Sequence, residues 1–278
     1  MKILSFGEVI WDLFPDKEYI GGAVFNFSAN LSILGADSYL LTCVGNDKLG
    51  DLAIEEFKKY NINQKYVTKH PLKSTGQCIV HFDEKIGPYY TIKDDVSYDY
   101  LSVNTDFYSE YFDAISFGSL ALRYKNNFEL LKTILKNNNY KLAFCDINLR
   151  PPFYSNDIIN FCFQHSNILK LNDLEFDEII NKQGLDYNTS LENFSKEYSN
   201  LDIILLTCGE KGAYAYDTKN KKLYFQEAIK VDVVSTVGAG DCFSATFLYN
   251  YLNNKDIQTC LLEAAKRSSK IVSQMAAI

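Results

Sequence analysis

Several things are missing from the sequence, and each absence excludes a class of protein. No apolar run approaches the roughly 20 residues that a membrane-spanning helix needs. Acidic residues outnumber basic ones, so the formal net charge is −7. This argues against a nucleic-acid-binding surface. The N-terminus reaches the acidic Glu8 before the apolar core of a signal peptide could form. We therefore expect a cytoplasmic protein that binds neither membranes nor nucleic acid.

Metal-binding and dinucleotide-binding motifs are also missing. The seven cysteines form no Cys-x-x-Cys pair and stand beside none of the three histidines in metal-ligand spacing, so we expect free thiols in a reducing compartment, several of them buried. Gly-x-Gly-x-x-Gly is absent, which makes a dinucleotide binder improbable. No repeat, low-complexity segment or Pro/Ser-rich linker divides the 278 residues. The prediction is one domain over residues 1–278.

What the sequence does contain is a Gly-Ala-Gly-Asp turn, Gly238 to Asp241. The β-branched run 229–234 before it predicts a strand, and the apolar spacing after it predicts a buried helix. Backbone N–H groups of Gly238, Ala239 and Gly240 would then form an anion site at the positive end of the helix dipole. The charge of Asp241 would oppose a bound phosphate, unless Asp241 takes a proton from an alcohol while the amides hold the phosphoryl group. The alternative is a tight turn in which Asp241 merely caps the helix.

A second polar group is expected near the N-terminus. Gly22 allows the backbone to approach a ligand closely, and Asn26 in the first turn of the following helix offers donors and acceptors to a neutral polar ligand. Asp12 stands alone among large hydrophobic residues, and a buried carboxylate needs partners. The hydroxyls of a polyol could supply them, although a salt bridge or a turn would explain Asp12 equally well.

The middle of the chain predicts a small flap, and the second half predicts a layered α/β fold. Residues 76–82 and 88–93 alternate as the strands of a hairpin around a polar turn. From residue 113 onward strands and helices alternate, which indicates a mostly parallel sheet covered on both faces. Its strands, expected at 114–117, 142–146, 168–171 and 203–207, end in polar or glycine residues, where open α/β sheets collect their ligands.

Two of these strand ends have two interpretations each. Asn172 and Glu175 are spaced as a helix-capping pair, but Glu175 or Asn172 could also lie near Mg²⁺ through water. Thr207, Gly209 and Gly212 form a glycine-flanked turn that suits nucleotide phosphates or ribose, or a simple hairpin corner.

These motifs, in this order, resemble the ribokinase-like sugar kinases of the phosphofructokinase-B type. The resemblance runs nearly end to end and includes Gly-Gly-Ala-x-x-Asn at 21–26, Asn-x-x-Glu at 172–175 and Gly-Ala-Gly-Asp at 238–241. The stretch 146–151 is most similar to the fructokinase branch. The resemblance implies a three-layer αβα sandwich with a mostly parallel central sheet. It also implies a β-lid built from about 13–20 and 76–97.

The resemblance also implies a reaction, the ATP-dependent phosphorylation of fructose to fructose 6-phosphate. Asp241 would accept the proton of the primary hydroxyl, and the amides of Ala239, Gly240 and Asp241 would stabilise the phosphoryl oxygens. Asp12, Gly22 and Asn26 would hold sugar hydroxyls, with Arg150 as a weaker candidate for substrate or phosphate. Asn172, Thr207, Gly209 and Gly212 would bind the nucleotide, and Glu175 would meet Mg²⁺ through water.

Alternatives remain open at this point. The substrate could be another sugar, or a nucleoside stacked on aromatic residues of the lid: Phe14, Tyr19, Tyr89 and Tyr90. A sugar-binding regulatory protein with weak catalysis would keep the same fold. The lid could also clasp a second copy in a homodimer.

Two departures from the family pattern fall on one presumed ion site. Ser235 stands where the family usually has aspartate, and Met275-Ala276-Ala277 replaces a Gly-Ala near the C-terminus. We therefore expect an active kinase with weak or absent K⁺ dependence.

Overall fold

The computed structural model of the chain describes residues 1–83, 87–180, 184–274 and 278. A nine-stranded sheet forms its centre, in the order β15-β14-β13-β12-β11-β9-β1-β4-β5. Its strands are β1 (Lys2–Phe6), β4 (Asp37–Gly45), β5 (Val67–His70), β9 (Ala114–Phe117), β11 (Ala143–Asp146), β12 (Ile168–Asn172), β13 (Ile203–Thr207), β14 (Ala213–Asp217) and β15 (Lys222–Gln226). All neighbours are parallel except at the β13-β14-β15 edge, which is antiparallel.

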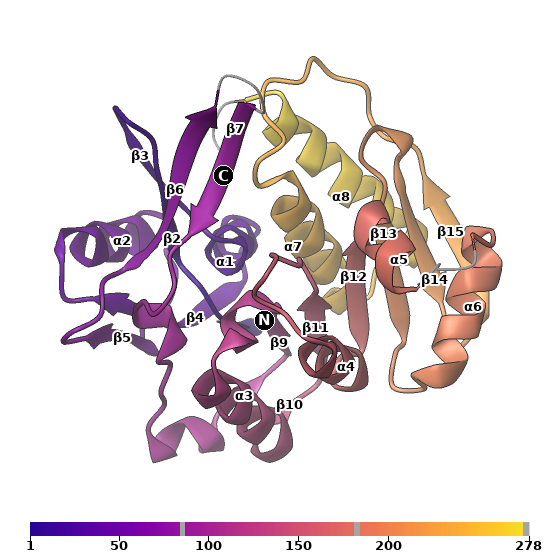
Figure 1. Cartoon of the computed structure of the whole chain (residues 1–278). Helices are drawn as coiled ribbons and strands as arrows, with labels where there is room; N and C mark the ends of the chain where they lie inside the picture. The colour runs from indigo at the N-terminus through magenta and orange to yellow at the C-terminus, as the bar shows by residue number, and fades with distance from the viewer. Residues whose placement is uncertain (84–86, 181–183, 275–277) are drawn as a thin grey trace.

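Helices cover both faces of this sheet (Figure 1). They are α1 (Ala23–Ile33), α2 (Lys48–Lys59), α3 (Lys125–Asn137), α4 (Asn156–Gln164), α5 (Asp173–Ile179), α6 (Tyr187–Glu197), α7 (Ala239–Leu252) and α8 (Ile257–Val272). Successive strand residues point to opposite faces, so Ile204 and Leu206 join the core that contains residues of α3, α4 and α6, whereas Ile203 and Leu205 join the core of α1, α7 and α8. The predicted three-layer arrangement is confirmed.

A second, four-stranded sheet stands beyond the carboxyl ends of the central strands (Figure 1). It consists of β2 (Ile10–Leu13), β3 (Glu18–Gly21), β6 (Gly76–Asp83) and β7 (Gly87–Ile92), in the order β3-β2-β6-β7. We call it the lid sheet. The predicted hairpin is therefore present, but the sheet also includes Ile10–Leu13, because β2 pairs in parallel with β6. The tip of the predicted polar turn, 84–86, lies outside the described residues.

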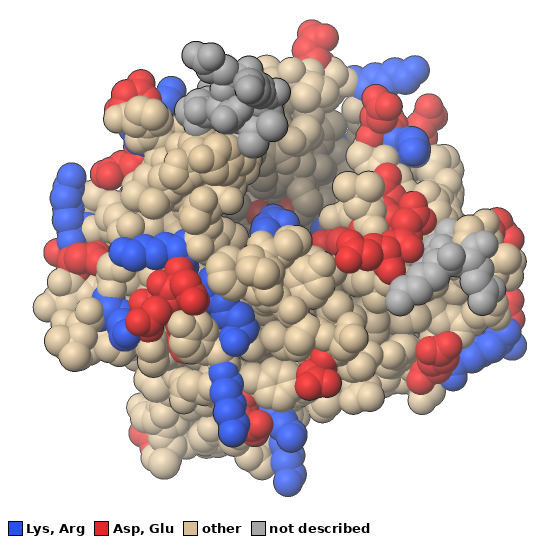
Figure 2. All heavy atoms as spheres, in the orientation of Figure 1, with Lys and Arg blue, Asp and Glu red and all other residues tan. Residues whose placement is uncertain are grey.

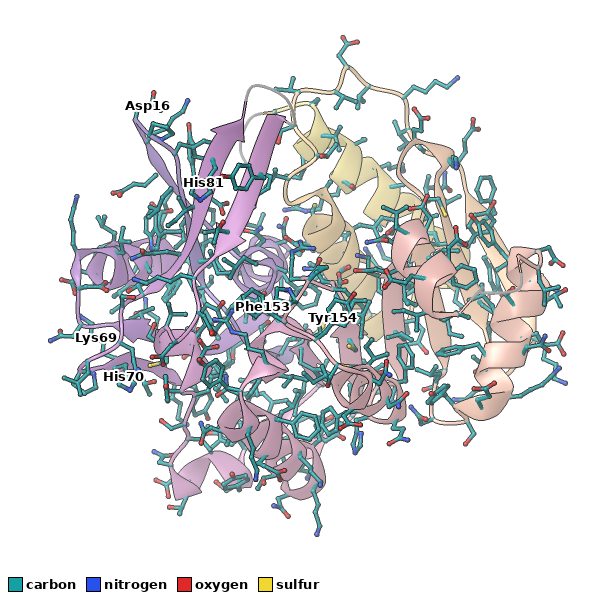
Figure 3. All side chains as sticks on the ribbon, in the orientation of Figure 1. Asp16, Lys69, His70, His81, Phe153 and Tyr154 are labelled. Atoms are coloured by element: carbon teal, nitrogen blue, oxygen red, sulfur yellow. The ribbon has the colours of Figure 1, made fainter. Side chains whose placement is uncertain are left out.

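The lid sheet is attached to the domain through apolar and ionic contacts. Ile10 and Cys78 pack in one cluster with Tyr98 and Leu120. Nearby, the guanidinium of Arg123 binds Asp99 through two hydrogen bonds of 2.7 Å and lies 4.5 Å from the ring centre of Phe153, which is labelled in Figure 3. Because both members of the ion pair are buried, they hold the segment after the lid in one place.

One sequence prediction about secondary structure is wrong. Residues 229–234 form no strand: they are an irregular segment in which Ile229, Val231, Val233 and Val234 are exposed. β-branched residues favour extended backbone, but a strand needs a neighbour to pair with. Among the described residues no strand pairs with 229–234, and β15 ends the sheet. The Val234 N–H bonds instead to the carbonyl of Val272 at the end of α8.

Two further sequence predictions concern burial and membrane crossing. All seven cysteines are free and buried, as expected. Among the described residues, no helix has the length and apolar character required to span a bilayer.

Candidate active site

The two glycine-containing motifs meet at Asp241. Gly238 adopts the left-handed conformation (φ 77°) that starts α7, and Asp241 lies in the first turn of that helix. The side-chain amide of Asn26, in the first turn of α1, donates a 2.8 Å hydrogen bond to Asp241 Oδ2 across a sequence separation of 215 residues. Burial raises the pKa of Asp241 to about 6, and the negative charge of Asp146 adds to that effect against the Asn26 hydrogen bond.

The turn ahead of Asp241 leaves backbone donors for an anion. The Ala239 N–H donates a long hydrogen bond of 3.3 Å to the carbonyl of Thr236. The Cys242 N–H donates to the carbonyl of Gly238. In the part of the chain that the structure describes, the amides of Gly240 and Asp241 have no such acceptor. These are two of the first N–H groups of a helix, which have no intrahelical partner. Of the expected anion-binding amides, Gly240 and Asp241 are therefore the ones available.

A buried lysine that sequence reasoning missed lies beside this turn. Lys170, near the end of β12, is 5% exposed, and its Nζ lies 3.0 Å from Asp146 Oδ1. The other oxygen of Asp146 accepts a 3.0 Å hydrogen bond from Ser244 of α7. A Cβ placed on Gly240 would lie 3.6 Å from Lys170 Nζ, so the ammonium group adjoins the anion-binding turn. Burial opposes the charge of Lys170, but Asp146 and Glu175 raise its pKa. The sequence feature that could have revealed Lys170 is its place within the otherwise apolar stretch 168–171.

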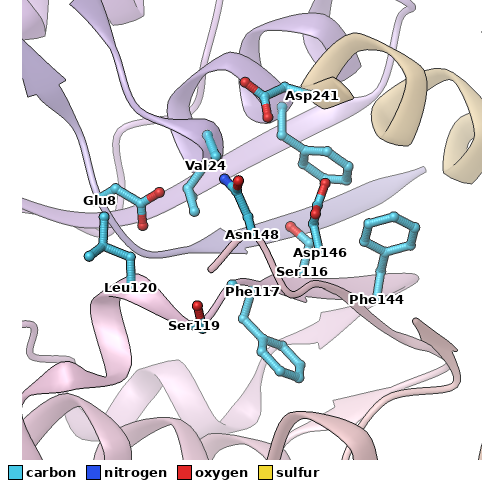
Figure 4. Close-up of a pocket in the computed structure, with 13 residues that line it drawn as sticks. Glu8, Val24, Ser116, Phe117, Ser119, Leu120, Phe144, Asp146, Asn148 and Asp241 are labelled. Atoms are coloured by element: carbon cyan, nitrogen blue, oxygen red, sulfur yellow. The ribbon is translucent and has the colours of Figure 1, made fainter. Parts of the chain in front are cut away.

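A pocket connects Asp241 to the ends of the first strands (Figure 4). Polar side chains from several elements line it: Glu8, Ser116, Ser119, Asp146, Asn148 and Asp241. Ala23, Val24, Phe27, Phe117, Leu120 and Phe144 supply the apolar part of its wall. On the outside, the surface is hollowed between the lid sheet and the C-terminal half (Figure 2).

The predicted sugar-binding residues surround the same place. Asp12 of β2 is partly buried, and burial raises its pKa while the Cys78 thiol and the charge of Arg150 lower it. Arg150 is exposed, and its charge also lowers the pKa of Asp241. Gly22 (φ 98°) is required for close packing, because a Cβ there would lie 3.1 Å from the Glu8 carbonyl oxygen. The structure thus brings Asp12, Gly22, Asn26 and Arg150 near Asp241.

The register of the lid sheet separates its aromatic residues by face. Tyr19 and Cys78 lie directly opposite Asp12, and Tyr90 is two residues along β7 from the partner of Cys78. Because side chains alternate along a strand, Tyr19 and Tyr90 share the face that carries Asp12. Tyr89 lies on the other face, stacked on His81 with ring centres 4.7 Å apart.

At the predicted nucleotide side, Asn172 and Glu175 form a reciprocal helix cap. Asn172 Oδ1 accepts from the Glu175 N–H and Glu175 Oε2 accepts from the Asn172 N–H, each at 2.9 Å. The remaining oxygen, Oε1, accepts from the Leu149 N–H at 2.8 Å. The capping interpretation is therefore confirmed, and contact with Mg²⁺ stays a prediction.

The turn after β13 is a hairpin corner whose glycines differ. Gly212 (φ 103°) is needed for packing, because a Cβ there would lie 2.2 Å from the Gln226 carbonyl oxygen. Gly209 (φ 53°) has open space on its Cβ side. Thr207, at the end of β13, donates through its hydroxyl to the Leu171 carbonyl at 3.3 Å. Gly212 thus has a packing role, and nucleotide contact by Thr207, Gly209 and Gly212 stays a prediction.

The presumed cation site is described only in part. Ser235 Oγ accepts a 3.3 Å hydrogen bond from the Val237 N–H. Residues 275–277, which carry the second departure, lie outside the described residues.

Comparisons with known proteins agree with this geometry. The family described as pfkB family carbohydrate kinase matches residues 4–278. A protein of Pyrococcus horikoshii described as an uncharacterized sugar kinase is 28% identical over 285 aligned positions, covering 98% of this chain and 88% of that protein. Its structure in complex with ATP superposes with a TM-score of 0.81, covering 99% of this chain and 93% of that one at 24% identity.

Two further similar proteins are named for two different substrates, a nucleoside and fructose. A nucleoside kinase of Methanocaldococcus jannaschii is 26% identical over 256 positions, covering 92% of this chain and 80% of that protein. A fructokinase double mutant of Vibrio cholerae, solved with fructose, ADP and potassium, has a TM-score of 0.80 at 18% identity, covering 99% of this chain and 93% of that one.

Proposed function

Because this chain belongs to the pfkB family of carbohydrate kinases, we propose that it transfers the γ-phosphoryl group of ATP to the primary hydroxyl of a free sugar, with fructose as the first candidate. One observation carries the proposal: the Asp241 carboxylate is held by Asn26 next to free helix-terminal amides and the buried Lys170. A base, an anion cradle and a cation at one point are the parts that phosphoryl transfer requires.

Asp241 is the general base in this mechanism. With a pKa of about 6, it is mostly ionised at neutral pH and still basic enough to take a proton from the attacking hydroxyl. Asn26 fixes the direction of the carboxylate through the 2.8 Å hydrogen bond. The proton moves from the sugar hydroxyl to the free oxygen of Asp241 as the hydroxyl oxygen bonds to phosphorus and the bond to the ADP oxygen breaks.

The turn and Lys170 stabilise the transferred group. The Gly240 and Asp241 N–H groups lie at the positive end of α7, where they favour the negative charge of phosphoryl oxygens. Lys170 supplies a positive charge beside Gly240. Thr207, Gly209 and Gly212 are proposed to contact the nucleotide along the sheet edge, with Asn172.

Mg²⁺ is proposed to enter with the nucleotide. Among the described residues, no three Asp, Glu, His or Cys side chains converge into a metal site, and Mg²⁺ commonly keeps several waters beside the phosphates. Glu175 would face its hydration shell through the lone pairs that the backbone hydrogen bonds leave free.

The proposed sugar-binding residues include one member of the lid sheet, Asp12 of β2. Asp12, Gly22 and Arg150 line the approach to Asp241 and suit a polyhydroxy ligand. The fructose-bound relative supports fructose as the first candidate. We propose weak or absent K⁺ activation because Ser235 replaces the usual aspartate, and a several-fold activation by K⁺ over a large organic cation would contradict this.

A nucleoside is the second candidate substrate. Tyr19 and Tyr90 are 49% and 61% exposed and share the face of the lid sheet that carries Asp12, where an aromatic ring could stack on a base. The nucleoside kinase relative supports the same possibility. On the opposite face, the exposed Tyr89 and its neighbour Ile79 support a homodimer through the lid, which light scattering tests by the mass in solution.

The direct test is a panel of sugars and nucleosides, with ADP release measured by a coupled assay. We expect turnover with a free hexose and its loss in Asp241→Asn. Asp106→Asn, a change of an exposed aspartate, is the matched control and should stay active. No turnover with any sugar or nucleoside would refute the proposed function.

A further inference from the structure

Glu8 is a buried carboxyl group that neither the sequence motifs nor the mechanism has used. It follows β1, is 3% exposed, and its Oε2 has no hydrogen-bond partner among the described residues. It lines the same pocket as Asp241, and Figure 4 shows its carboxylate turned toward that space. Buried polar atoms are almost always hydrogen-bonded, so an orphaned oxygen facing a pocket indicates a missing partner.

A second orphaned atom lies in the wall of this pocket. Ser119 Oγ is buried and has no partner in the described part of the chain. Leaving such an atom unpaired is costly, and two of them in one pocket are best explained by hydrogen-bonding atoms that enter it.

The backbone holds Glu8 in this position firmly. Gly7 has φ 147°, and a Cβ on it would lie 2.7 Å from Val24 Cγ2. Gly22 packs against the Glu8 carbonyl, as described above. The segment that places Asn26 beside Asp241 therefore also places Glu8, so the two carboxylates are fixed relative to each other.

The size of the pocket limits what can enter it. Its space of about 30 Å³ compares with the roughly 10–15 Å³ that one water needs, so it holds about two non-hydrogen atoms. A space of that size suits one carbon of a sugar with its hydroxyl. Val24 and Leu120 make part of the pocket wall apolar. Contact with apolar side chains favours a carbon atom over a second water molecule.

We propose that Glu8 is a substrate-binding residue: in the pocket it shares with Asp241, it hydrogen-bonds a second hydroxyl of the sugar whose primary hydroxyl Asp241 deprotonates. This inference rests on the proposed kinase function. Ser119, whose hydroxyl both donates and accepts, completes the partners of that hydroxyl. A sugar lacking it would leave both atoms unpaired, so the pocket selects for hydroxylation at one carbon.

The charges around Glu8 support this role. Burial raises the pKa of Glu8 to about 7; the charge of Asp241 also raises it, whereas the charge of Arg150 and nearby backbone N–H groups lower it. Among the described residues, the phenol of Tyr98 also interacts electrostatically with Glu8. Near neutral pH the carboxyl group therefore exists in both forms, and either form can bond a hydroxyl, which donates and accepts.

The test pairs variants of Glu8 with singly deoxygenated analogues of the sugar that gives the highest turnover. Glu8→Leu should lower kcat/KM for the parent sugar about 10- to 100-fold, the effect of one lost buried hydrogen bond. Glu8→Gln, which keeps a donor and an acceptor, should lower it by less than about 5-fold. With one analogue, the one that lacks the bound hydroxyl, Glu8→Leu should have almost no further effect.

Thr42→Val is the matched control, because Thr42 Oγ1 is also buried and orphaned but does not line the pocket. It should leave kcat/KM unchanged for every sugar. Equal losses with all analogues, or no loss in Glu8→Leu, would overturn the inference and assign the pocket to ordered water. If the unaltered protein phosphorylates no sugar, the proposed function itself fails, which is a separate result.

Discussion

Asp241 should make the folded protein less stable, and the substitution Asp241→Asn tests this. An ordinary aspartate has a pKa of 3.8, whereas that of Asp241 is about 6, chiefly because its carboxylate is desolvated. The folded state therefore holds the ionised form less favourably than the unfolded chain does. One pKa step is worth about 1.4 kcal/mol, so this difference corresponds to about 3 kcal/mol, or about 2 kcal/mol after discounting for the solvent that reaches the group.

The size of this cost depends on pH in a defined way. Below about pH 4 the carboxyl is protonated in both states and costs nothing. Between about pH 4 and 6 the unfolded chain ionises first, and the cost builds up; above about pH 6 it is complete. Asp241→Asn removes the charge, and the introduced amide oxygen can still accept the hydrogen bond from Asn26. The variant should therefore gain about 2 kcal/mol at neutral pH and almost nothing near pH 4.

Urea unfolding followed by circular dichroism between about pH 4 and 8 measures this difference, with Asp106→Asn as a control that should match the unaltered protein. The same variant should lose kcat by at least about 100- to 10,000-fold, the range of general-base catalysis. In the unaltered enzyme, kcat/KM should fall as the pH drops below about 6. A variant that is less stable than the parent at pH 8, or equally stabilised at every pH, would refute the desolvated-base reasoning.

Three other predictions concern the neighbouring groups. Lys170→Met should lower kcat at least about 100-fold, because a cation is lost beside the phosphoryl site and Asp146 loses its partner; unchanged kcat in the coupled assay would remove Lys170 from the mechanism. Asp99→Asn leaves the buried Arg123 with only the exposed Asp94, 3.9 Å away, and should cost about 3–5 kcal/mol in urea unfolding, whereas a loss below about 1 kcal/mol would show that the pair is hydrated. The seven cysteines are buried, so a thiol reagent should react with almost none of them in the folded protein and with all seven in denaturant; rapid reaction of several without denaturant would contradict the packing.

Features that depend on neighbours in the chain were predictable from the sequence. The Asn172–Glu175 cap follows from spacing alone, because its two hydrogen bonds join residues three positions apart. The alternation of strands and helices predicted the sheet, and the glycines before Asp241 predicted a helix N-terminus with free amides. These features are local, and the side-chain types that produce them act within one turn or one strand.

Features that depend on distant residues were decided by the tertiary structure. The run 229–234 has strand composition but pairs with no described strand, and only the folded chain shows that its end is held by α8 instead. The contact between Asn26 and Asp241 joins two helices from opposite ends of the chain. Lys170 and Glu8 owe their importance to burial beside other charges, and desolvation is a property of the assembled surroundings. The amino-acid sequence thus determined which chemical groups are present, and the packing of distant elements decided which of them share one pocket.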